Sequence, residues 1–497
     1  METTTFNLSK SHRILFFNTL AFTACFAVWT LNGVLATYLA DKGVFKWGAI
    51  ELGWLLGIPI LTGSIFRLPV GVMTDRIGGK WVFVFILLFC AISVYLLSYA
   101  NDFTSFVILS LCFGMAGTGF AVGIAYTSVW YPKEWQGRAL GIFGMGNAGA
   151  ALTTLFAPTL LNNFTDNGKN IQNWVMLPKV YAVMMLIIAV LFVLFTENKK
   201  PSTPSRTISQ MLRPLSSVRV WRFGLYYFLV FGCFVAFSQW LVPYFVNVYG
   251  ASLVIAGIFA SVFSFPSGVI RALGGWMSDK WGARKVMKGV FEWSIVISAL
   301  LIFPKMLIIT PGKGIMATKS GKVTHVSDTL IRVDDKSYPI IKKPEKETGS
   351  EWDILPSKVM WQEPVVQEGQ EVKKKQLLAK GISQISFEAN MWIYGILVTI
   401  IGVVWGIGKA AVYKYIPDYF PNDVGAVGGM VGVLGGLGGF ICPIIFGYLL
   451  EWTGLWTSCW MLMLVLSIIC YWWLQKVVSG IVAKKAPSIS EQFEIKN

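Results

Sequence analysis

Two arginines lie inside apolar stretches, at matching places in two related segments. Arg67 begins segment 67–78 (RLPVGVMTDRIG), and Arg271 begins segment 271–282 (RALGGWMSDKWG), 204 residues later. Each arginine precedes a polar turn by eight residues, which at 1.5 Å per helical residue puts it about 12 Å inside a hydrocarbon core about 30 Å thick. A guanidinium at that depth is costly and needs an anion nearby.

The sequence offers these arginines few carboxylates. Glu51 lies at the far end of the same helix as Arg67, and Glu292 lies on another helix. Two guanidinium groups at matching depth in two halves favour one small anion held between the halves, because planar N–H donors can meet a flat oxyanion bidentately. The alternative is a structural ion pair within the bundle.

A third cation, Lys409, lies at similar depth, eight residues before Pro417. The pKa of lysine moves readily on burial and near other cations, so Lys409 is a candidate for a group that loses and regains a proton. The alternative is a side chain that extends to the membrane surface.

Asp75 with Arg76, and Asp279 with Lys280, occupy the two matched turns. A carboxylate at a helix end can bridge to a neighbouring helix and hold one conformation, so we predict that these residues gate. The alternative is a pair of solvated turns with ordinary cytoplasmic charges.

The elements that position these residues are membrane helices. The chain has 497 residues, 55% of them apolar and 14% charged, with a mean hydropathy of +0.60, which indicates a polytopic membrane protein. We predict an all-α protein of twelve transmembrane helices in two six-helix halves. The expected spans are 13–40, 49–74, 80–99, 103–130, 137–161, 175–196, 221–248, 252–277, 285–309, 390–416, 424–449 and 455–477.

Positive charges predict the topology. Lysines and arginines gather in the loops on one side of the predicted spans and in the linker between the halves, so we expect an inner-membrane protein with both termini cytoplasmic. The predicted divisions are an N-terminal bundle (1–196), a cytoplasmic linker (197–220), a C-terminal bundle (221–309 and 389–480) and a cytoplasmic tail (481–497).

A hydrophilic insert interrupts the C-terminal bundle. Pro132 and Pro158 reappear as Pro417 and Pro443, so the offset between the repeats has grown from 204 to 285 residues. Residues 310–388 account for the difference and alternate as short strands, which predicts an extracytoplasmic all-β module. Segment 365–381 resembles barrel-sandwich hybrid hairpins but has no carrier lysine flanked by methionines, so we expect a structural role or an unknown docking partner.

Composition argues against other classes of protein. There are two histidines, both outside apolar runs, and seven cysteines within them, so we expect no cofactor, no metal site, no redox chemistry and no enzyme. The net charge of +16 follows membrane topology rather than nucleic-acid binding.

Glycine-rich segments carry a family resemblance. Segments 116–123 (AGTGFAVG), 130–141 (WYPKEWQGRALG) and 146–149 (GNAG), with 425–439 (GAVGGMVGVLGGLGG), resemble the signatures of the nitrate/nitrite porters of the major facilitator superfamily. The resemblance implies that Arg67 and Arg271 clamp nitrate or nitrite, between apolar walls from Phe120 and Phe231. It further implies hydrogen-bond donors from Tyr227 and Asn147, and Lys409 makes the chain similar to the nitrate–proton symporter branch.

We therefore expect a monomeric carrier that imports nitrate by alternating access, coupled to protons. Nitrate/nitrite exchange is the first alternative. The others are a carrier of larger organic or phosphorylated anions, an exporter of cationic drugs, and a sensor or assembly platform that acts through the β insert without transport.

Overall fold

The structure is a computed structural model that describes residues 8–200, 208–302, 306–343, 357–387, 390–420 and 423–485. The chain forms two compact units. Met1–Leu300 together with Leu397–Asn497 makes the helical bundle, and Leu301–Ile396 makes the insert.

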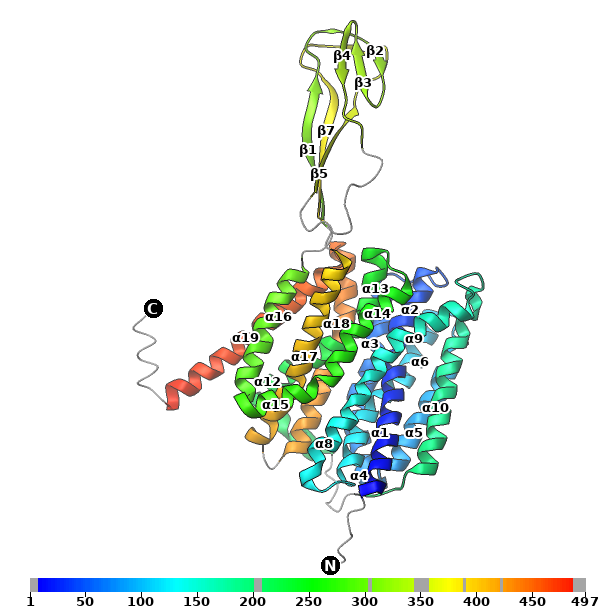
Figure 1. Cartoon of the computed structure of the whole chain (residues 1–497), viewed down its shortest axis with the longest axis vertical. Coiled ribbons are helices and arrows are strands. Elements are labelled where there is room, and N and C mark those ends of the chain that lie inside the picture. The colour runs from blue at the N-terminus through cyan, green and yellow to red at the C-terminus, as the bar shows by residue number, and fades with distance from the viewer. Residues whose placement is uncertain are drawn as a thin grey trace, which may run out of the picture. The chain divides into compact units, whose positions relative to one another are not determined.

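The N-terminal half of the bundle is helical throughout (Figure 1). Its elements are α1 (Leu8–Trp29), α2 (Asn32–Asp41), α3 (Ala49–Ile65), α4 (Arg67–Ile77), α5 (Gly79–Leu97), α6 (Phe103–Phe113), η1 (Gly114–Thr118), α7 (Gly119–Ser128), α8 (Lys133–Gly144), η2 (Met145–Ala148), α9 (Gly149–Phe164), η3 (Ile171–Val175) and α10 (Met176–Phe195).

The C-terminal half repeats this pattern on both sides of the insert. Its elements are α11 (Ile208–Leu212), η4 (Arg213–Ser216), α12 (Val218–Tyr227), η5 (Phe228–Cys233), α13 (Phe234–Tyr249), α14 (Leu253–Val269), α15 (Arg271–Trp281), α16 (Ala283–Leu301), α17 (Met391–Tyr419), α18 (Val424–Thr453) and α19 (Ser458–Lys485).

Among the described residues, nine helical segments are long and apolar enough to cross a membrane, and two bent pairs raise the number to eleven. The remaining predicted span is α16, which is helical but carries Arg284, Lys285, Lys288 and Glu292. These charges explain why α16 alone falls outside that group.

Both bent pairs break directly before an arginine of the sequence repeat. The axis turns by 41° between α3 and α4, where Arg67 begins α4, and by 43° between α14 and α15, where Arg271 begins α15. Pro69 follows the first bend and Pro266 precedes the second, and each lacks the N–H that would continue the helical ladder. The backbone thus changes direction where the charge is buried.

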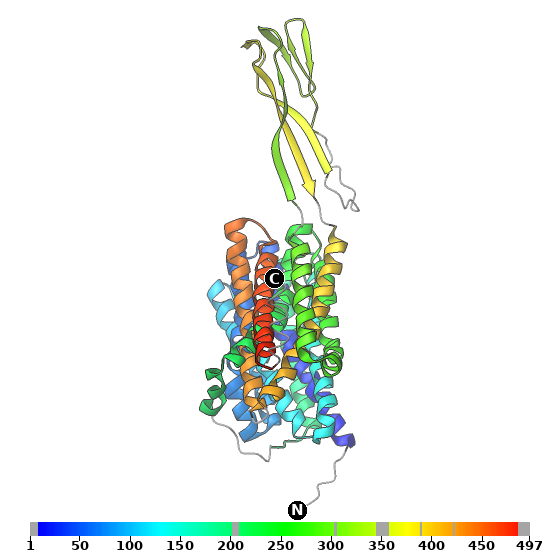
Figure 2. The ribbon, with the colours of Figure 1, turned by 90° about the vertical axis from the view of Figure 1, so that its left-hand side faces the viewer.

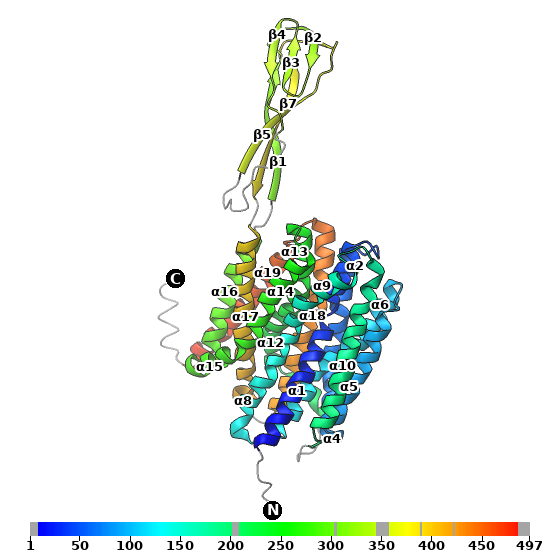
Figure 3. The same cartoon turned by 45° about the vertical axis from the view of Figure 1, so that its right-hand side comes forward.

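The two halves approach closely on one side of these bends. A Cβ on Gly57 of α3 would lie 2.5 Å from the carbonyl oxygen of Phe440, and one on Gly257 of α14 would lie 2.1 Å from that of Thr154. At the other end, where α10 finishes and α12 begins, α4, α8 and α15 carry glycines with no described atom within 4 Å of an added Cβ, among them Gly71 and Gly275 (Figure 3). We call this the linker end; the halves are in contact at the opposite end.

The insert is a β module of two antiparallel sheets (Figure 2). One has the order β1-β7-β5 and the other β4-β3-β2-β6. The strands are β1 (Met306–Met316), β2 (Gly321–Val326), β3 (Leu330–Val333), β4 (Lys336–Pro339), β5 (Ser357–Pro364), β6 (Glu371–Val372) and β7 (Leu377–Phe387).

The start of the insert differs from the prediction. Residues 306–309 were expected at the end of a membrane helix, but β1 already begins at Met306 and pairs with Phe387. An apolar run of this length suits a paired strand as well as a helix end, so hydropathy did not separate them. Buried apolar side chains, including Val323, Ile331 and Leu378, give the module its own core.

Candidate anion-binding site

Arg67 is buried at the bend between α3 and α4, with 5% of its surface exposed. Its Nη1 donates to the carbonyl oxygen of Gly432 at 3.0 Å, and its Nε donates to that of Gly117 at 3.4 Å. Its Nη2 is buried and has no hydrogen-bond partner among the described residues. The side chain is thus fixed by two backbone oxygens and keeps one donor available.

Aromatic rings surround the two arginines. The Cζ of Arg67 lies 5.6 Å from the ring centroids of Trp29, Phe120 and Phe231. The Cζ of Arg271, which is half-buried, lies 5.8 Å from the same Phe120 ring. One ring therefore contacts a guanidinium from each half, and it offers neither arginine a negative charge.

A second aromatic group links the arginines through the C-terminal half. The Tyr413 ring centroid lies 5.6 Å from the Cζ of Arg271 and 5.0 Å from the Tyr227 ring, which stacks on Phe231 at 4.9 Å. The Tyr413 hydroxyl donates to the carbonyl oxygen of Gly428 at 3.3 Å. We did not predict Tyr413, although it follows Lys409 by one helical turn and so shares its face of α17.

Lys409 lies beside Arg271 in the C-terminal half. Only 2% of its surface is exposed, its Nζ donates to Ser267 Oγ at 2.9 Å, and the ring of Phe234 lies directly beside the ammonium group. Ser267 precedes Arg271 by four residues, so this hydrogen bond ties Lys409 to the segment that carries Arg271. The structure thus places Lys409 inside the bundle rather than extending to its surface.

In the described part of the chain, no carboxylate pairs with any of these three cations. Glu51 accepts from the backbone N–H of Gly48 at 2.9 Å, and Glu292 pairs with Lys288 at 3.7 Å. The partners of these three positive groups among the described residues are aromatic rings, one hydroxyl and two carbonyl oxygens. Such a region attracts an anion because burying uncompensated charge is costly.

Asn147 forms its side-chain hydrogen bond outside the arginine cluster. Its Nδ2 donates to the carbonyl oxygen of Gly144 at 2.9 Å, within its own helix, and its Oδ1 is buried without a hydrogen-bond partner among the described residues. The structure therefore brings together five of the six predicted binding residues, which are Arg67, Arg271, Phe120, Tyr227 and Phe231. Among the described residues, Asn147 has no hydrogen bond with either arginine.

Glycines of α18 let its backbone approach the arginine. A Cβ on Gly436 would lie 2.2 Å from Ser64 Oγ and 3.6 Å from Arg67 Nη1, and one on Gly435 would lie 2.2 Å from the Tyr227 ring. Larger residues at these two positions would displace the side chains that form the cluster.

The two predicted gating turns differ in their contacts. Asp279 Oδ1 lies 2.5 Å from Lys414 Nζ on α17, and Lys280 lies over the ring of Trp276. Within the described residues, neither Asp75 nor Arg76 forms an ion pair or a side-chain hydrogen bond. Each turn ends in a glycine with positive φ, Gly78 at 100° and Gly282 at 83°.

Comparisons with known proteins agree with this architecture. The sequence model of the Major Facilitator Superfamily matches residues 17–317, more than half of the chain. The fold is similar to that of a bacterial homologue of the human lysosomal transporter Spinster in an inward-facing, occupied conformation, with a TM-score of 0.65 and 12% identity over 95% of this chain and 98% of that one.

Two curated relatives cover nearly the whole chain. A Thermus thermophilus protein named "Probable nitrate/nitrite antiporter NarK1" is 35% identical over 97% of this chain and 95% of its own length. A Staphylococcus haemolyticus protein named "Probable nitrate transporter NarT" is 24% identical over 88% and 89% of the two chains. These matches confirm the predicted fold class and a transporter rather than an enzyme. The chain belongs to the Major Facilitator Superfamily, in the group that contains the nitrate and nitrite transporters.

Proposed function

We propose that this protein imports nitrate across the inner membrane by alternating access, with the anion held between Arg67 and Arg271. The observation that carries the proposal is the buried Nη2 of Arg67, a charged donor without a hydrogen-bond partner among the described residues, beside a second guanidinium on the same ring. A small planar oxyanion supplies the acceptors that this donor lacks.

The aromatic lining supports a small, weakly hydrated anion. Phe120 and Phe231 offer apolar faces, and Tyr227 and Tyr413 place phenol groups at the edge of the same space. Apolar walls disfavour anions that keep a firm water shell, and this argues against phosphorylated cargo. Asn147 is a further proposed donor, and binding would require its side chain to turn from Gly144.

The bends at the arginines support a mechanism of movement. Because α4 and α15 begin at Arg67 and Arg271, a change in either bend moves a guanidinium together with the linker-end part of its helix. In this structure the halves meet at the end opposite the linker. We propose that this is the inward-open state, with the linker and both termini cytoplasmic, and that Asp75, Arg76, Asp279 and Lys280 act in closing that end.

The proposed import of nitrate is coupled to protons. An inside-negative membrane opposes anion entry by about 2.3 kcal/mol per charge per 100 mV, so import requires a compensating proton or anion. Lys409 is buried among aromatic and hydroxyl groups beside Arg271, where a change in its protonation alters the charge next to the anion. We propose that it carries the coupled proton.

Exchange is the second candidate, since the Thermus thermophilus relative is named as a nitrate/nitrite antiporter. Purified protein in proteoliposomes separates the two modes. Nitrate uptake driven by an inward pH gradient, with no anion inside, supports symport. Uptake that requires internal nitrite supports exchange. Absence of nitrate flux under both conditions would refute nitrate as the transported anion.

A further inference from the structure

Each half of the bundle carries three cations at matching positions of its linker end. Lys10 and Arg13 begin the first helix of the N-terminal half, and Arg219 and Arg222 stand 209 residues later on α12. Lys80 begins α5, and Arg284 stands 204 residues later on α16. The duplication thus repeats a triad of cations.

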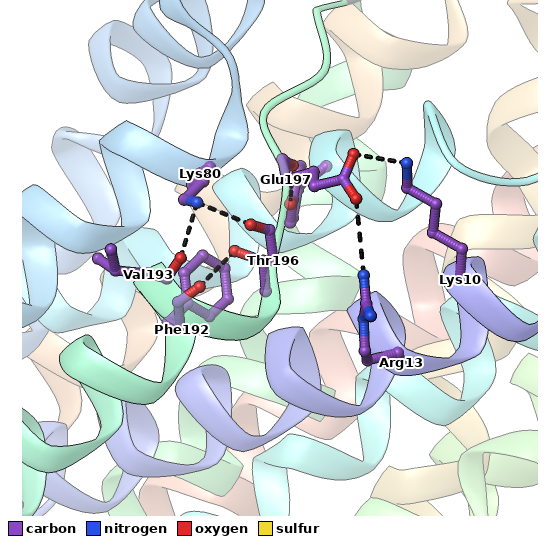
Figure 4. Close-up of polar contacts among 8 residues, drawn as sticks. Lys10, Arg13, Lys80, Phe192, Val193, Thr196 and Glu197 are labelled. Atoms are coloured by element: carbon purple, nitrogen blue, oxygen red, sulfur yellow. Dashed lines mark hydrogen bonds and ion pairs between the residues drawn. The ribbon is translucent and has the colours of Figure 1, made fainter.

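The N-terminal triad is neutralised within the protein (Figure 4). Glu197, just after α10, pairs with Lys10 at 2.5 Å and with Arg13 at 3.6 Å. Lys80 donates to the carbonyl oxygens of Val193 and Thr196 at the end of α10, at 2.8 and 2.7 Å. A carboxylate and the negative end of a helix therefore satisfy all three cations.

Among the described residues, the C-terminal triad has no such partners. The Cζ atoms of Arg219 and Arg284 lie 5.3 and 5.8 Å from the centroid of the Tyr419 ring, and Arg284 donates to the Tyr419 hydroxyl. Arg222 is only 9% exposed and forms neither an ion pair nor a hydrogen bond with any described residue. Most of the Arg222 side chain is thus covered by the protein, while its guanidinium nitrogens reach the molecular surface, where an anion can meet them.

Two buried hydroxyls share this region. The Arg222 Cζ lies 5.3 Å from the Phe223 ring, which stacks on Tyr415 at 5.1 Å, and Tyr226 follows Arg222 by one turn of α12. The hydroxyl groups of Tyr226 and Tyr415 are buried without hydrogen-bond partners in the described structure. The last helix of this half offers no counterpart of Glu197, since its final described segment, 476–485 (KVVSGIVAKK), contains no carboxylate. Among the described residues, the site therefore has donors and no paired carboxylate like Glu197.

We propose that Arg219, Arg222 and Arg284 bind the phosphate group of an anionic phospholipid, which takes the place that the Glu197 carboxylate holds in the other half. Arginine suits this ligand because its planar fork meets phosphate oxygens bidentately, and hydroxyls of Tyr226 and Tyr415 add neutral donors. Exposed Trp221 and Val218 on α12 give the acyl chains an apolar surface beside the cations.

Native mass spectrometry of the delipidated full-length protein, titrated with phosphatidylglycerol, tests this site. We expect Arg219→Gln/Arg222→Gln to weaken binding of the tightest phosphatidylglycerol by about tenfold or more, because two charge-assisted contacts are lost. The matched control, Lys10→Gln/Arg13→Gln, removes the same charge from the same end of the other half and should change that affinity by less than about twofold. Equal losses in the two variants, or none in either, would overturn the proposal.

Two competition experiments identify the ligand, and a further variant tests the site if the double variant does not fold. Phosphatidylcholine has no net charge and should not compete, and competition at equal concentration would contradict an anion site. Inorganic phosphate that displaces the lipid at millimolar concentration would support the phosphate chemistry and refute the lipid as its source. The single variant Arg284→Gln should weaken binding in the same direction if the double variant fails to fold. None of these readouts depends on the transported anion.

Discussion

Arg67 donates a hydrogen bond to the carbonyl oxygen of Gly432 at 3.0 Å, which joins α4 of the N-terminal half to α18 of the C-terminal half. A bond between the halves must break when they rock apart on that side. An anion bound to Arg67 would replace the lost acceptor. The guanidinium could therefore bind the anion in one state and the carbonyl oxygen of Gly432 in the other.

The first prediction concerns the several N–H donors of the Arg67 guanidinium. In Arg67→Lys the charge remains, but one ammonium cannot reach Gly117, Gly432 and an anion together. We expect the KM for nitrate uptake in proteoliposomes to rise about tenfold or more. Arg138→Lys, at an exposed position, is the control and should leave KM unchanged. A normal KM in Arg67→Lys would refute the proposed clamp.

The second prediction concerns the close approach of the α18 backbone to the Tyr227 ring at Gly435. Alanine there would place its Cβ 2.2 Å from the Tyr227 ring, so the ring or α18 must shift, at a cost of about 1–3 kcal/mol. We expect Gly435→Ala to reduce nitrate uptake severely. Gly428→Ala on the same helix meets its nearest neighbour at 3.7 Å and should retain uptake. Similar uptake by both variants would show that Tyr227 need not hold this position.

The third prediction separates coupling from binding. Lys409→Gln keeps a polar side chain next to Ser267 but removes the titrating group. We expect uptake driven by a pH gradient to fall at least tenfold, while exchange of external for internal nitrate persists. Ser267→Ala removes only the hydroxyl and should keep most of the gradient-driven uptake. Loss of both modes in Lys409→Gln would assign Lys409 to anion binding instead.

The fourth prediction concerns the turn at the end of α15. The Asp279–Lys414 ion pair is substantially exposed, so its contribution to stability is about 1 kcal/mol or less and is screened by salt. We expect the Tm of the wild type to fall more than that of Asp279→Asn as salt is raised from low to physiological concentration. Asp75→Asn should follow the wild type, because Asp75 has no ion pair among the described residues. Parallel salt dependence in all three proteins would contradict a role for the pair.

The fifth prediction concerns the insert as a separate folding unit. Replacing residues 306–387 by a short glycine–serine linker removes every strand, and we expect nitrate uptake to stay within about twofold, because the bundle is a compact unit of its own. Ile331→Ala, which opens a cavity in the β core, should destabilise the insert by about 2–5 kcal/mol with the same small effect on uptake. Loss of uptake in both variants would show that transport needs the folded insert.

A binding role for the insert has its own readout. We propose that it docks an extracytoplasmic partner, in which case crosslinked complexes should disappear when residues 306–387 are replaced while uptake continues. Identical crosslinking patterns with and without the insert would leave no partner to assign to it.

The sequence by itself determined which residues are charged at membrane depth. Repeated segments with an eight-residue spacing placed Arg67 and Arg271 at equivalent depth, and strand alternation predicted a β module between the helices of the C-terminal half. These properties follow from local periodicity and from the cost of burying charge, which one chain shows without its neighbours.

Only the tertiary structure decided which side chains meet. Tyr413 joins the cluster because α17 packs against the end of α12, and the Asn147 side chain donates to the backbone of Gly144. Glu197 pairs with Lys10 and Arg13 of the N-terminal half. Such contacts depend on helix rotation and packing between segments hundreds of residues apart. Sequence periodicity fixes the face of a helix, but the partner of that face is set by the rest of the fold.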